Sequence, residues 1–217
     1  MNPPIVYFVD DDDAVRESLA LLLETAGHVC KGYGDAFSLL HDLPEDAAGC
    51  LVSDLKMPGM NGLELQAELT RRHVRLPMLF LTGHGDVPAS VEAMRAGAED
   101  FLLKPVNGQT LLRKVEALLA REAARREEET RLRHLRTRLE KLSPRERQIL
   151  ALALAGVPNK DLARQLELSH RTVEVHRSRI FLKLGVNNLL DVMQLGAALN
   201  LPVGTLIGWL EADSGQV

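Results

Sequence analysis

Short apolar runs alternate with amphipathic helical patterns over residues 1–120. Apolar runs bounded by turn residues predict five strands, Ile5–Val9, His28–Gly32, Cys50–Ser53, Met78–Leu81 and Asp100–Leu103. Apolar positions at helical spacing predict helices near residues 14–26, 35–42, 62–73 and 87–97, and from Asn107 onward. Strands that alternate with helices form parallel βαβ units, whose right-handed crossovers place helices on both faces of one sheet. We therefore expect a doubly wound α/β domain with a five-stranded parallel sheet.

The helix that starts near Asn107 is predicted to run well past this domain, because no Gly or Pro interrupts residues 109–142. Its middle, residues 120–131, is almost wholly charged or alanine, which is typical of a solvated single helix. Its end carries a short heptad seam, with spacings of three, four and three between Leu132, Leu135, Leu139 and Leu142. The pattern leaves two interpretations, a single helix or a dimer contact through the leucine end.

After Leu142 the pattern is helical throughout. Ser143 is a predicted N-cap, Pro144 takes the first helical position and Glu146 completes a capping box, so a helix begins here and runs to Ala155.

A second short helix follows, with Asn159 as its expected cap, and the tight turn Glu167–Ser169 separates it from a third helix, "HRTVEVHRSRIFLKLG". A fourth helix covers residues 187–200. Two helices joined by a tight turn, the second with Arg and His on an exposed face, describe a helix-turn-helix, although any small helical bundle would share the pattern.

Length and charge support two domains with different partners. A chain of 217 residues is long enough for two compact cores. Its net charge of -4 argues against a nucleic-acid binder when taken whole, but residues 1–120 carry -8, residues 121–142 carry +3 and residues 143–217 carry +1. The acidic part and the less acidic part therefore have separate roles.

Composition also bears on location. No apolar stretch approaches the length of a membrane span, and the N-terminus lacks the basic and apolar regions of a signal peptide. Cys30 and Cys50 lie far apart without zinc-ligand spacing. We expect a cytoplasmic protein with no membrane contact.

Polar side chains follow four of the five predicted strands. Asp10 and Asp11 follow the first strand, Asp54 ends the third, Thr82 the fourth, and Lys104 follows the fifth. Since ligands of open α/β sheets bind outside the carboxyl ends of the strands, these groups are expected to converge. Three carboxylates need a divalent cation, and a carboxylate beside a hydroxyl and an ammonium suits phosphoryl transfer. The simpler alternatives are that Asp12 or Asp13 caps the next helix and that Lys104 only pairs with the acids.

Two enzyme classes fit this edge poorly. Haloacid-dehalogenase-type phosphatases also use an aspartate nucleophile with Mg²⁺, but they need a second acid two residues later, where this chain has Lys56. ATP hydrolysis is not supported, because the phosphate-binding pattern GxxxxGK[ST] does not occur.

Residues 1–120 resemble the receiver domain of bacterial two-component response regulators, on the segments "SDLKMPGMNG", "LTGHGD" and "FLLKP". The resemblance implies a strand order of 2-1-3-4-5, phosphorylation of Asp54 by a sensor histidine kinase, and Mg²⁺ (or Mn²⁺) held by Asp10, Asp11, Asp54 and the Lys56 carbonyl. It also implies that Thr82, Lys104 and Phe101 respond to the phosphoryl group, and that the Lys104–Pro105 bond is cis. The protein would then be no enzyme beyond its own phosphorylation and dephosphorylation.

Residues 142–199 resemble the LuxR-type DNA-binding domain, and "TVEVHRSRIFLKLGV" is close to its recognition-helix signature. Val173, Ile180 and Leu184 are then core residues, facing Leu162, Ala163 and Leu166. Exposed Glu174, Val175 and Ser178 would face bases. The remaining expected DNA contacts, of which the basic ones suit phosphates, are Lys160, Thr172, Arg177, Arg179 and Lys183.

Together the two halves resemble a NarL/FixJ-type response regulator, and "TGHGDVP" favours the FixJ branch. The implied layout is a receiver (1–120), a helical linker (121–141), a four-helix DNA-binding domain (142–200) and a tail (201–217) with no assigned function. The implied partners are the kinase, promoter DNA, RNA polymerase and a second copy, which would bind through Val91, Met94 and Arg95 on phosphorylation. The alternative is a receiver that signals through protein contacts alone, without sequence-specific DNA binding.

Overall fold

The computed structural model describes residues 3–83, 100–198 and 200–212. The chain divides into two compact units, Met1–Arg126 and Glu127–Val217. Among the described residues no single helix is long and apolar enough to cross a membrane. Only His170–Ala198 and Val203–Leu210 taken together, a pair bent by 105°, reach that length and composition.

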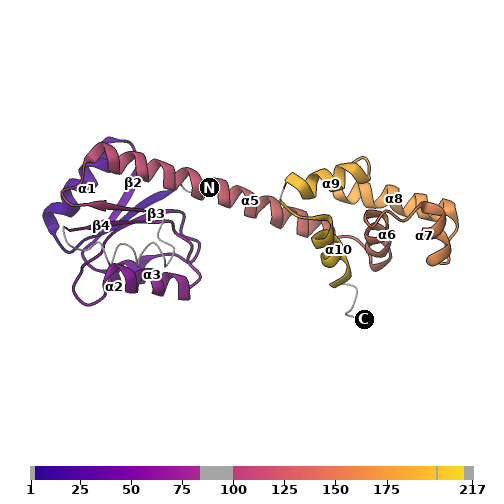
Figure 1. The fold of residues 1–217 in the computed structure, drawn as a ribbon, viewed down its shortest axis with the longest axis horizontal. Coiled ribbons are helices and arrows are strands. Elements are labelled where there is room, and N and C mark those ends of the chain that lie inside the picture. Colours follow the sequence, from indigo (N-terminus) through magenta and orange to yellow (C-terminus); the bar gives the residue numbers. More distant parts are fainter. Residues whose placement is uncertain (1–2, 84–99, 199, 213–217) are drawn as a thin grey trace. The chain divides into compact units, whose positions relative to one another are not determined.

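The first unit is built on a parallel sheet of β1 (Ile5–Val9), β2 (Val29–Tyr33), β3 (Gly49–Asp54), β4 (Met78–Thr82) and β5 (Asp100–Leu103). The strands lie in the order β2-β1-β3-β4-β5, which confirms the predicted sheet. Figure 1 draws the whole chain and labels β2, β3 and β4 of this sheet. The predicted bounds shift by a residue or two, because β2 starts at Val29 and β3 and β4 each extend to the polar residue that ends them.

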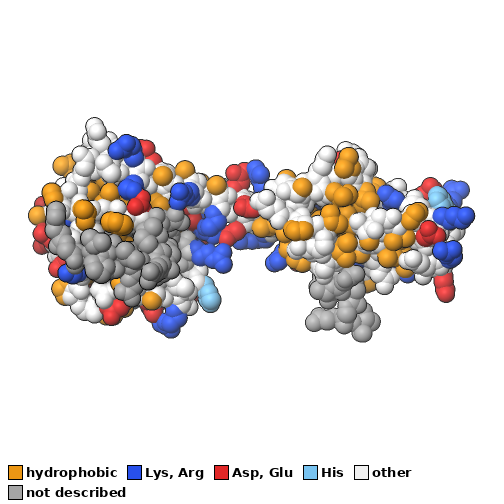
Figure 2. Space-filling model, viewed as in Figure 1, with side chains coloured by type: hydrophobic (Ala, Val, Ile, Leu, Met, Phe, Trp, Pro, Cys, Tyr) orange, Lys and Arg blue, Asp and Glu red, His pale blue; other side chains and the backbone are white. Residues whose placement is uncertain are grey.

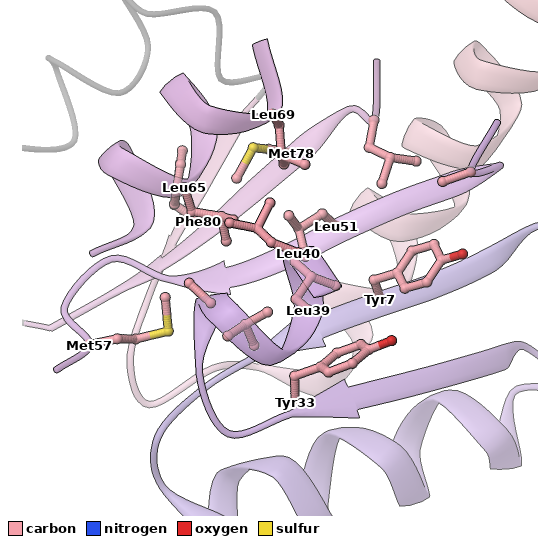
Figure 3. Close-up of a cluster of buried hydrophobic side chains, with 14 of the residues drawn as sticks. Tyr7, Tyr33, Leu39, Leu40, Leu51, Met57, Leu65, Leu69, Met78 and Phe80 are labelled. Atoms are coloured by element: carbon pink, nitrogen blue, oxygen red, sulfur yellow. The ribbon is translucent and has the colours of Figure 1, made fainter. Parts of the chain in front are cut away.

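Helices cover both faces of this sheet: α1 (Asp13–Thr25), α2 (Ala36–Asp42), α3 (Gly62–Arg71) and the first part of α5 (Gly108–Glu140). On one face, α2 and α3 pack on side chains of β1, β3 and β4 (Figure 3). On the other, α1 and α5 pack on Val6, Phe8 and Leu79. Such burial on both faces explains why the strands read as continuous apolar runs. The helix predicted near residues 87–97 lies outside the described residues.

The second unit contains α6 (Pro144–Leu154), α7 (Asn159–Gln165), α8 (His170–Leu184), α9 (Leu189–Ala198) and α10 (Val203–Ala212). The predicted capping box at α6 is confirmed, because the Ser143 side chain accepts from the Glu146 N–H and Glu146 accepts from the Ser143 N–H. Helix α8 ends at Gly185, whose φ of 65° is left-handed.

The predicted cap of α7 is wrong. Pro158 is the N-cap, and Asn159 is the first helical residue. The Asn159 side-chain oxygen instead accepts a hydrogen bond from the Arg177 guanidinium of α8. A long-range charged donor has therefore replaced the local backbone N–H as its partner.

The core of the second unit is larger than the four predicted helices. Leu135 and Leu139 of α5, and Leu142 just after it, are buried with Ile180 and Leu184 of α8. Of the two interpretations left open, this burial favours the single helix, because the leucine seam is covered by its own chain. Within the tail, to which the sequence assigned no function, Val203–Ala212 form α10, and Leu206 and Leu210 join the same core.

Candidate functional site

Three carboxylates meet at the carboxyl edge of the sheet. Asp10 follows β1, Asp11 comes next, and Asp54 ends β3. One oxygen from each lies within 4.8 Å of the others. Asp10 is fully buried, the Asp54 side chain is 13 % exposed, and Asp11 is exposed. Hard oxygen donors so close together are typical of a divalent metal site.

The four consecutive aspartates, Asp10 to Asp13, make different contacts. Asp12 is the N-cap of α1 and accepts from the N–H groups of Ala14 and Val15. Asp13, in the first helical turn, forms an ion pair with Arg16. The helix-cap interpretation holds for Asp12, Asp13 pairs with Arg16 within α1, and Asp10 and Asp11 remain for the acidic cluster.

Lys104 bridges this cluster. Its Nζ lies 2.6 Å from Asp10 Oδ2 and 2.7 Å from Asp54 Oδ2. Burial lowers the pKa of the Lys104 ammonium, but its hydrogen bonds to both carboxylates and their negative charge outweigh this effect, so its pKa lies above the ordinary value. Lys104 is thus a charged donor at neutral pH. The Lys104–Pro105 bond is cis.

The neighbouring backbone shapes the surroundings of Asp54. The Lys56 N–H donates to Asp54 Oδ1 at 3.1 Å. The loop after β3 returns closely enough that a Cβ on Gly62 would lie 2.6 Å from the Asp54 carbonyl oxygen. Only glycine fits that approach, so the segment "SDLKMPGMNG" holds the loop against the strand end.

The two remaining predicted residues of this edge lie on β4 and β5. Thr82 is 1 % exposed, and its carbonyl oxygen accepts from the Lys104 N–H at 2.8 Å. Phe101 is half-buried and pairs in register with Phe80. Val91, Met94 and Arg95 of the expected dimer face lie outside the described residues.

The acidic cluster fits a divalent cation. Asp10 and Asp11 do not cap a helix, and both lie beside Asp54. Among the described residues, Lys104 is the ammonium that donates to two of the three carboxylates. Asp10, Asp11 and Asp54 supply the oxygens that would hold the ion.

In the second unit, α8 has one buried and one exposed face. Val173, Ile180 and Leu184 are buried, as expected from the family resemblance. Glu174, Val175, Ser178 and Arg179 are exposed, and Thr172 is half-buried. Lysine and arginine side chains of this unit gather toward the end that carries α7 (Figure 2), where Lys160 is exposed.

Two of the predicted phosphate contacts are engaged inside the unit. Lys183 Nζ lies 2.6 Å from Glu146 Oε2 of α6, and the Glu146 side chain is 4 % exposed. Arg177 donates to Asn159 and lies with its Cζ 5.6 Å from the centre of the Phe181 ring. Both cations therefore hold α8 against its neighbours.

Sequence reasoning missed three interactions. Arg16 Nη1 donates to the Asp10 carbonyl oxygen at 2.8 Å and so ties α1 to the acidic edge. Arg138 donates to the Leu184 carbonyl oxygen, and Glu146 pairs with Lys183. Only the capping-box position of Glu146 gave any signal, and the Arg138–Leu184 and Lys183–Glu146 partners are far apart in the chain.

The comparisons with known proteins agree with this geometry. The profile described as "Response regulator receiver domain" matches residues 6–116, and that described as "Bacterial regulatory proteins, luxR family" matches residues 140–195.

Similar proteins cover nearly the whole chain. The transcriptional regulatory protein FixJ of Azorhizobium caulinodans is 42% identical over 88% of this chain and 90% of its own. Nodulation protein W of Bradyrhizobium diazoefficiens is 38% identical over 91% and 87%. The solved structure of the response regulator StyR matches with a TM-score of 0.83 and 40% identity, over 91% of this chain and all of StyR. Full-length FixJ from B. japonicum matches with a TM-score of 0.59 and 38% identity, over 92% and 98%. The chain belongs to the NarL/FixJ-type response regulators and is a DNA-binding transcriptional regulator with an N-terminal receiver domain and a LuxR-type domain.

Proposed function

We propose that Asp54 is the phosphoacceptor and that a sensor histidine kinase is the donor. The observation that carries this proposal is the cluster of Asp10, Asp11 and Asp54 bridged by Lys104. In it a partly exposed carboxylate has two carboxylate neighbours for a metal ion and one ammonium for a phosphoryl oxygen.

In the proposed reaction, an Asp54 carboxylate oxygen attacks the phosphorus of the kinase phosphohistidine. A P–O bond forms as the P–N bond breaks, and the leaving imidazole nitrogen keeps the electron pair. Mg²⁺, or Mn²⁺ on the same oxygen ligands, offsets the phosphoryl charge when bound. Lys104 transfers its hydrogen bond from Asp54 Oδ2 to a phosphoryl oxygen, and Thr82 supplies a hydroxyl donor from the next strand. Hydrolysis of the acyl phosphate returns Asp54 to a carboxylate, so no external substrate is turned over.

Lys104 and Thr82 are proposed to convert phosphorylation into a conformational change, with Phe101 following on the adjacent strand. Both residues are linked through the backbone, since the Lys104 N–H donates to the Thr82 carbonyl oxygen. Phe101 is half-buried against the core beside them, so a shift of Lys104 and Thr82 reaches an aromatic ring at the surface.

We expect the variant Lys104→Ala to accept phosphate but to lose the response to it. A hydrogen bond to a charged group contributes about 1.5–3 kcal/mol, so loss of the Lys104 contact weakens phosphorylation-induced dimerisation about ten- to hundredfold. Intact-protein mass measures labelling, and sedimentation measures dimerisation. Lys31→Ala is the matched control and behaves as wild type. Lys31 is an exposed lysine of β2 that pairs with Asp42. Normal dimerisation of Lys104→Ala would refute this role.

The second unit is proposed to read promoter DNA through the exposed face of α8. Glu174, Val175 and Ser178 face the bases, and Lys160, Thr172 and Arg179 contact the backbone. Arg177 and Lys183 border the DNA while they hold α8. Phosphorylation promotes a homodimer through Val91, Met94 and Arg95, and the dimer binds two half-sites and recruits RNA polymerase. Promoter DNA and the kinase's phosphodonor are both reached in the cytoplasm, which is the proposed location.

Dimerisation tests this proposal. We expect wild-type protein with Mg²⁺ and beryllofluoride to sediment as a dimer at concentrations where untreated protein is a monomer. The affinity for DNA should rise by the same coupling free energy, because linkage is reciprocal. Asp54→Asn is the control that stays monomeric. A rise in DNA affinity without dimerisation would replace this mechanism with the release of an inhibitory interdomain contact.

A further inference from the structure

The C-terminal end of α8 is held by a side chain from α5. Arg138 Nη1 donates to the Leu184 carbonyl oxygen at 3.0 Å. This carbonyl lies in the last turn of α8, where backbone oxygens have no partner within the helix. The turn at Gly185 satisfies two other carbonyls, since the N–H groups of Gly185 and Val186 donate to Leu182 and Phe181. Neither of these N–H groups donates to the Leu184 carbonyl oxygen, and Arg138 supplies its hydrogen bond.

Arg138 also lies against the turn itself. A Cβ on Gly185 would lie 3.7 Å from Arg138 Nη1, which places the guanidinium beside the left-handed residue that ends the helix. A cation at this end of a helix interacts favourably with the helix dipole.

A second side chain anchors the same end of α8. Lys183 pairs with Glu146, which also accepts from the Ser143 N–H at 2.7 Å. Burial raises the pKa of Glu146, but the hydrogen bonds from Lys183 and Ser143 outweigh it, so the net pKa is below the ordinary value. Glu146 is therefore ionised at neutral pH, and α6 and α5 both hold the last turn of α8.

The end of α5 is fixed in turn. Arg147 of α6 donates to the carbonyl oxygens of Glu140 and Leu142, each at 3.2 Å. Leu135 and Leu139, on the turns around Arg138, are buried in the core that contains Ile180 and Leu184. Arg138 thus projects from a packed helix end, and its side chain, although exposed, is bound to the Leu184 carbonyl oxygen.

We propose that Arg138 is a positioning residue for DNA recognition. By fixing the last turn of α8, it sets how the face bearing Glu174, Val175 and Ser178 is presented to the bases. This inference rests on the proposed DNA-reading role of α8. Arg138 and the recognition helix both belong to the second unit, so this contact lies within the DNA-binding part of the chain.

The test compares full-length wild type with Arg138→Met, Arg138→Lys and Arg133→Met. The Met variant keeps the apolar stem and loses the donor, and the Lys variant restores a cation. Arg133→Met removes the same charge from another exposed position on the same helix. The probe is the duplex that wild-type protein selects most strongly from a random-sequence pool. Its Kd is measured over a range of salt concentrations, and amide hydrogen exchange is followed over residues 180–186.

We expect Arg138→Met to raise the Kd about five- to tenfold, because the variant loses the cap of α8. The salt dependence of the Kd should not change, because no phosphate contact is lost. Exchange in the last turn of α8 accelerates by a similar factor. Arg138→Lys recovers part of both effects, and Arg133→Met shows neither.

Three results would overturn the proposal. A salt slope reduced by about one, with normal exchange, would make Arg138 a direct phosphate contact. Faster exchange with an unchanged Kd would make it a local cap without a role in recognition. If wild type selected no sequence, the DNA-reading role of α8 would itself fail, and the exchange data would still show separately whether Arg138 holds Leu184.

Discussion

Asp54→Asn loses Mg²⁺-dependent phosphorylation by small-molecule phosphodonors. The amide oxygen is a poor nucleophile, and the change also removes one of the three carboxylates that would hold the ion, so labelling falls at least about a hundredfold. Incubation with acetyl phosphate and Mg²⁺, followed by the mass of the intact protein, measures the gain of one phosphoryl group. Chelation of Mg²⁺ should abolish labelling of wild type in the same assay.

The matched control is Asp42→Asn. Asp42 is an exposed carboxylate of the same unit that pairs with Lys31, and it takes no part in the acidic cluster. This variant labels as wild type does. Normal labelling of Asp54→Asn would instead assign the phosphate to another residue, and peptide mapping would locate it.

Leu139→Ala destabilises the second unit by about 2–5 kcal/mol, the range for removal of a buried leucine side chain. Leu139 is 6 % exposed and packs in the core with Ile180 and Leu184, although it lies on α5. The chain has one tryptophan, Trp209 of α10. The centre of its ring lies 4.3 Å from Arg136 Cζ. Its fluorescence during urea unfolding therefore reports on the second unit.

Leu182→Ala is the control for this prediction. Leu182 is 82 % exposed on α8, so the same truncation opens no cavity and leaves the urea midpoint within error. A coiled coil through the leucine seam would give the opposite pattern for Leu139→Ala, with an unchanged midpoint and a change in oligomeric state. That outcome would contradict the packing of α5 into the second unit.

Much of the receiver was predictable because its signals are local. Each strand is a short apolar run, most strand ends are marked by a polar residue, and right-handed crossovers leave few ways to arrange them. The rule that ligands bind at the carboxyl edge of the sheet was therefore enough to predict that the polar groups of this edge converge, namely Asp10, Asp11, Asp54, Thr82 and Lys104. The capping box at Ser143 was equally readable, since all its partners lie within one turn.

The sequence by itself determined the two-domain order, the parallel sheet and the acidic edge, because hydrophobic periodicity and strand-end chemistry act over a few neighbouring residues. Only the tertiary structure decided what pairs across the chain. The leucine seam left a dimer contact open, because nothing local reveals that α6, α8 and α10 cover it. Asn159 read as a cap because its true partner, Arg177, lies 18 residues away, and Arg138 meets Leu184 across 46 residues. Such contacts depend on which helix faces meet in space, and the pattern along one helix shows that a face is apolar or charged but not which partner will cover it.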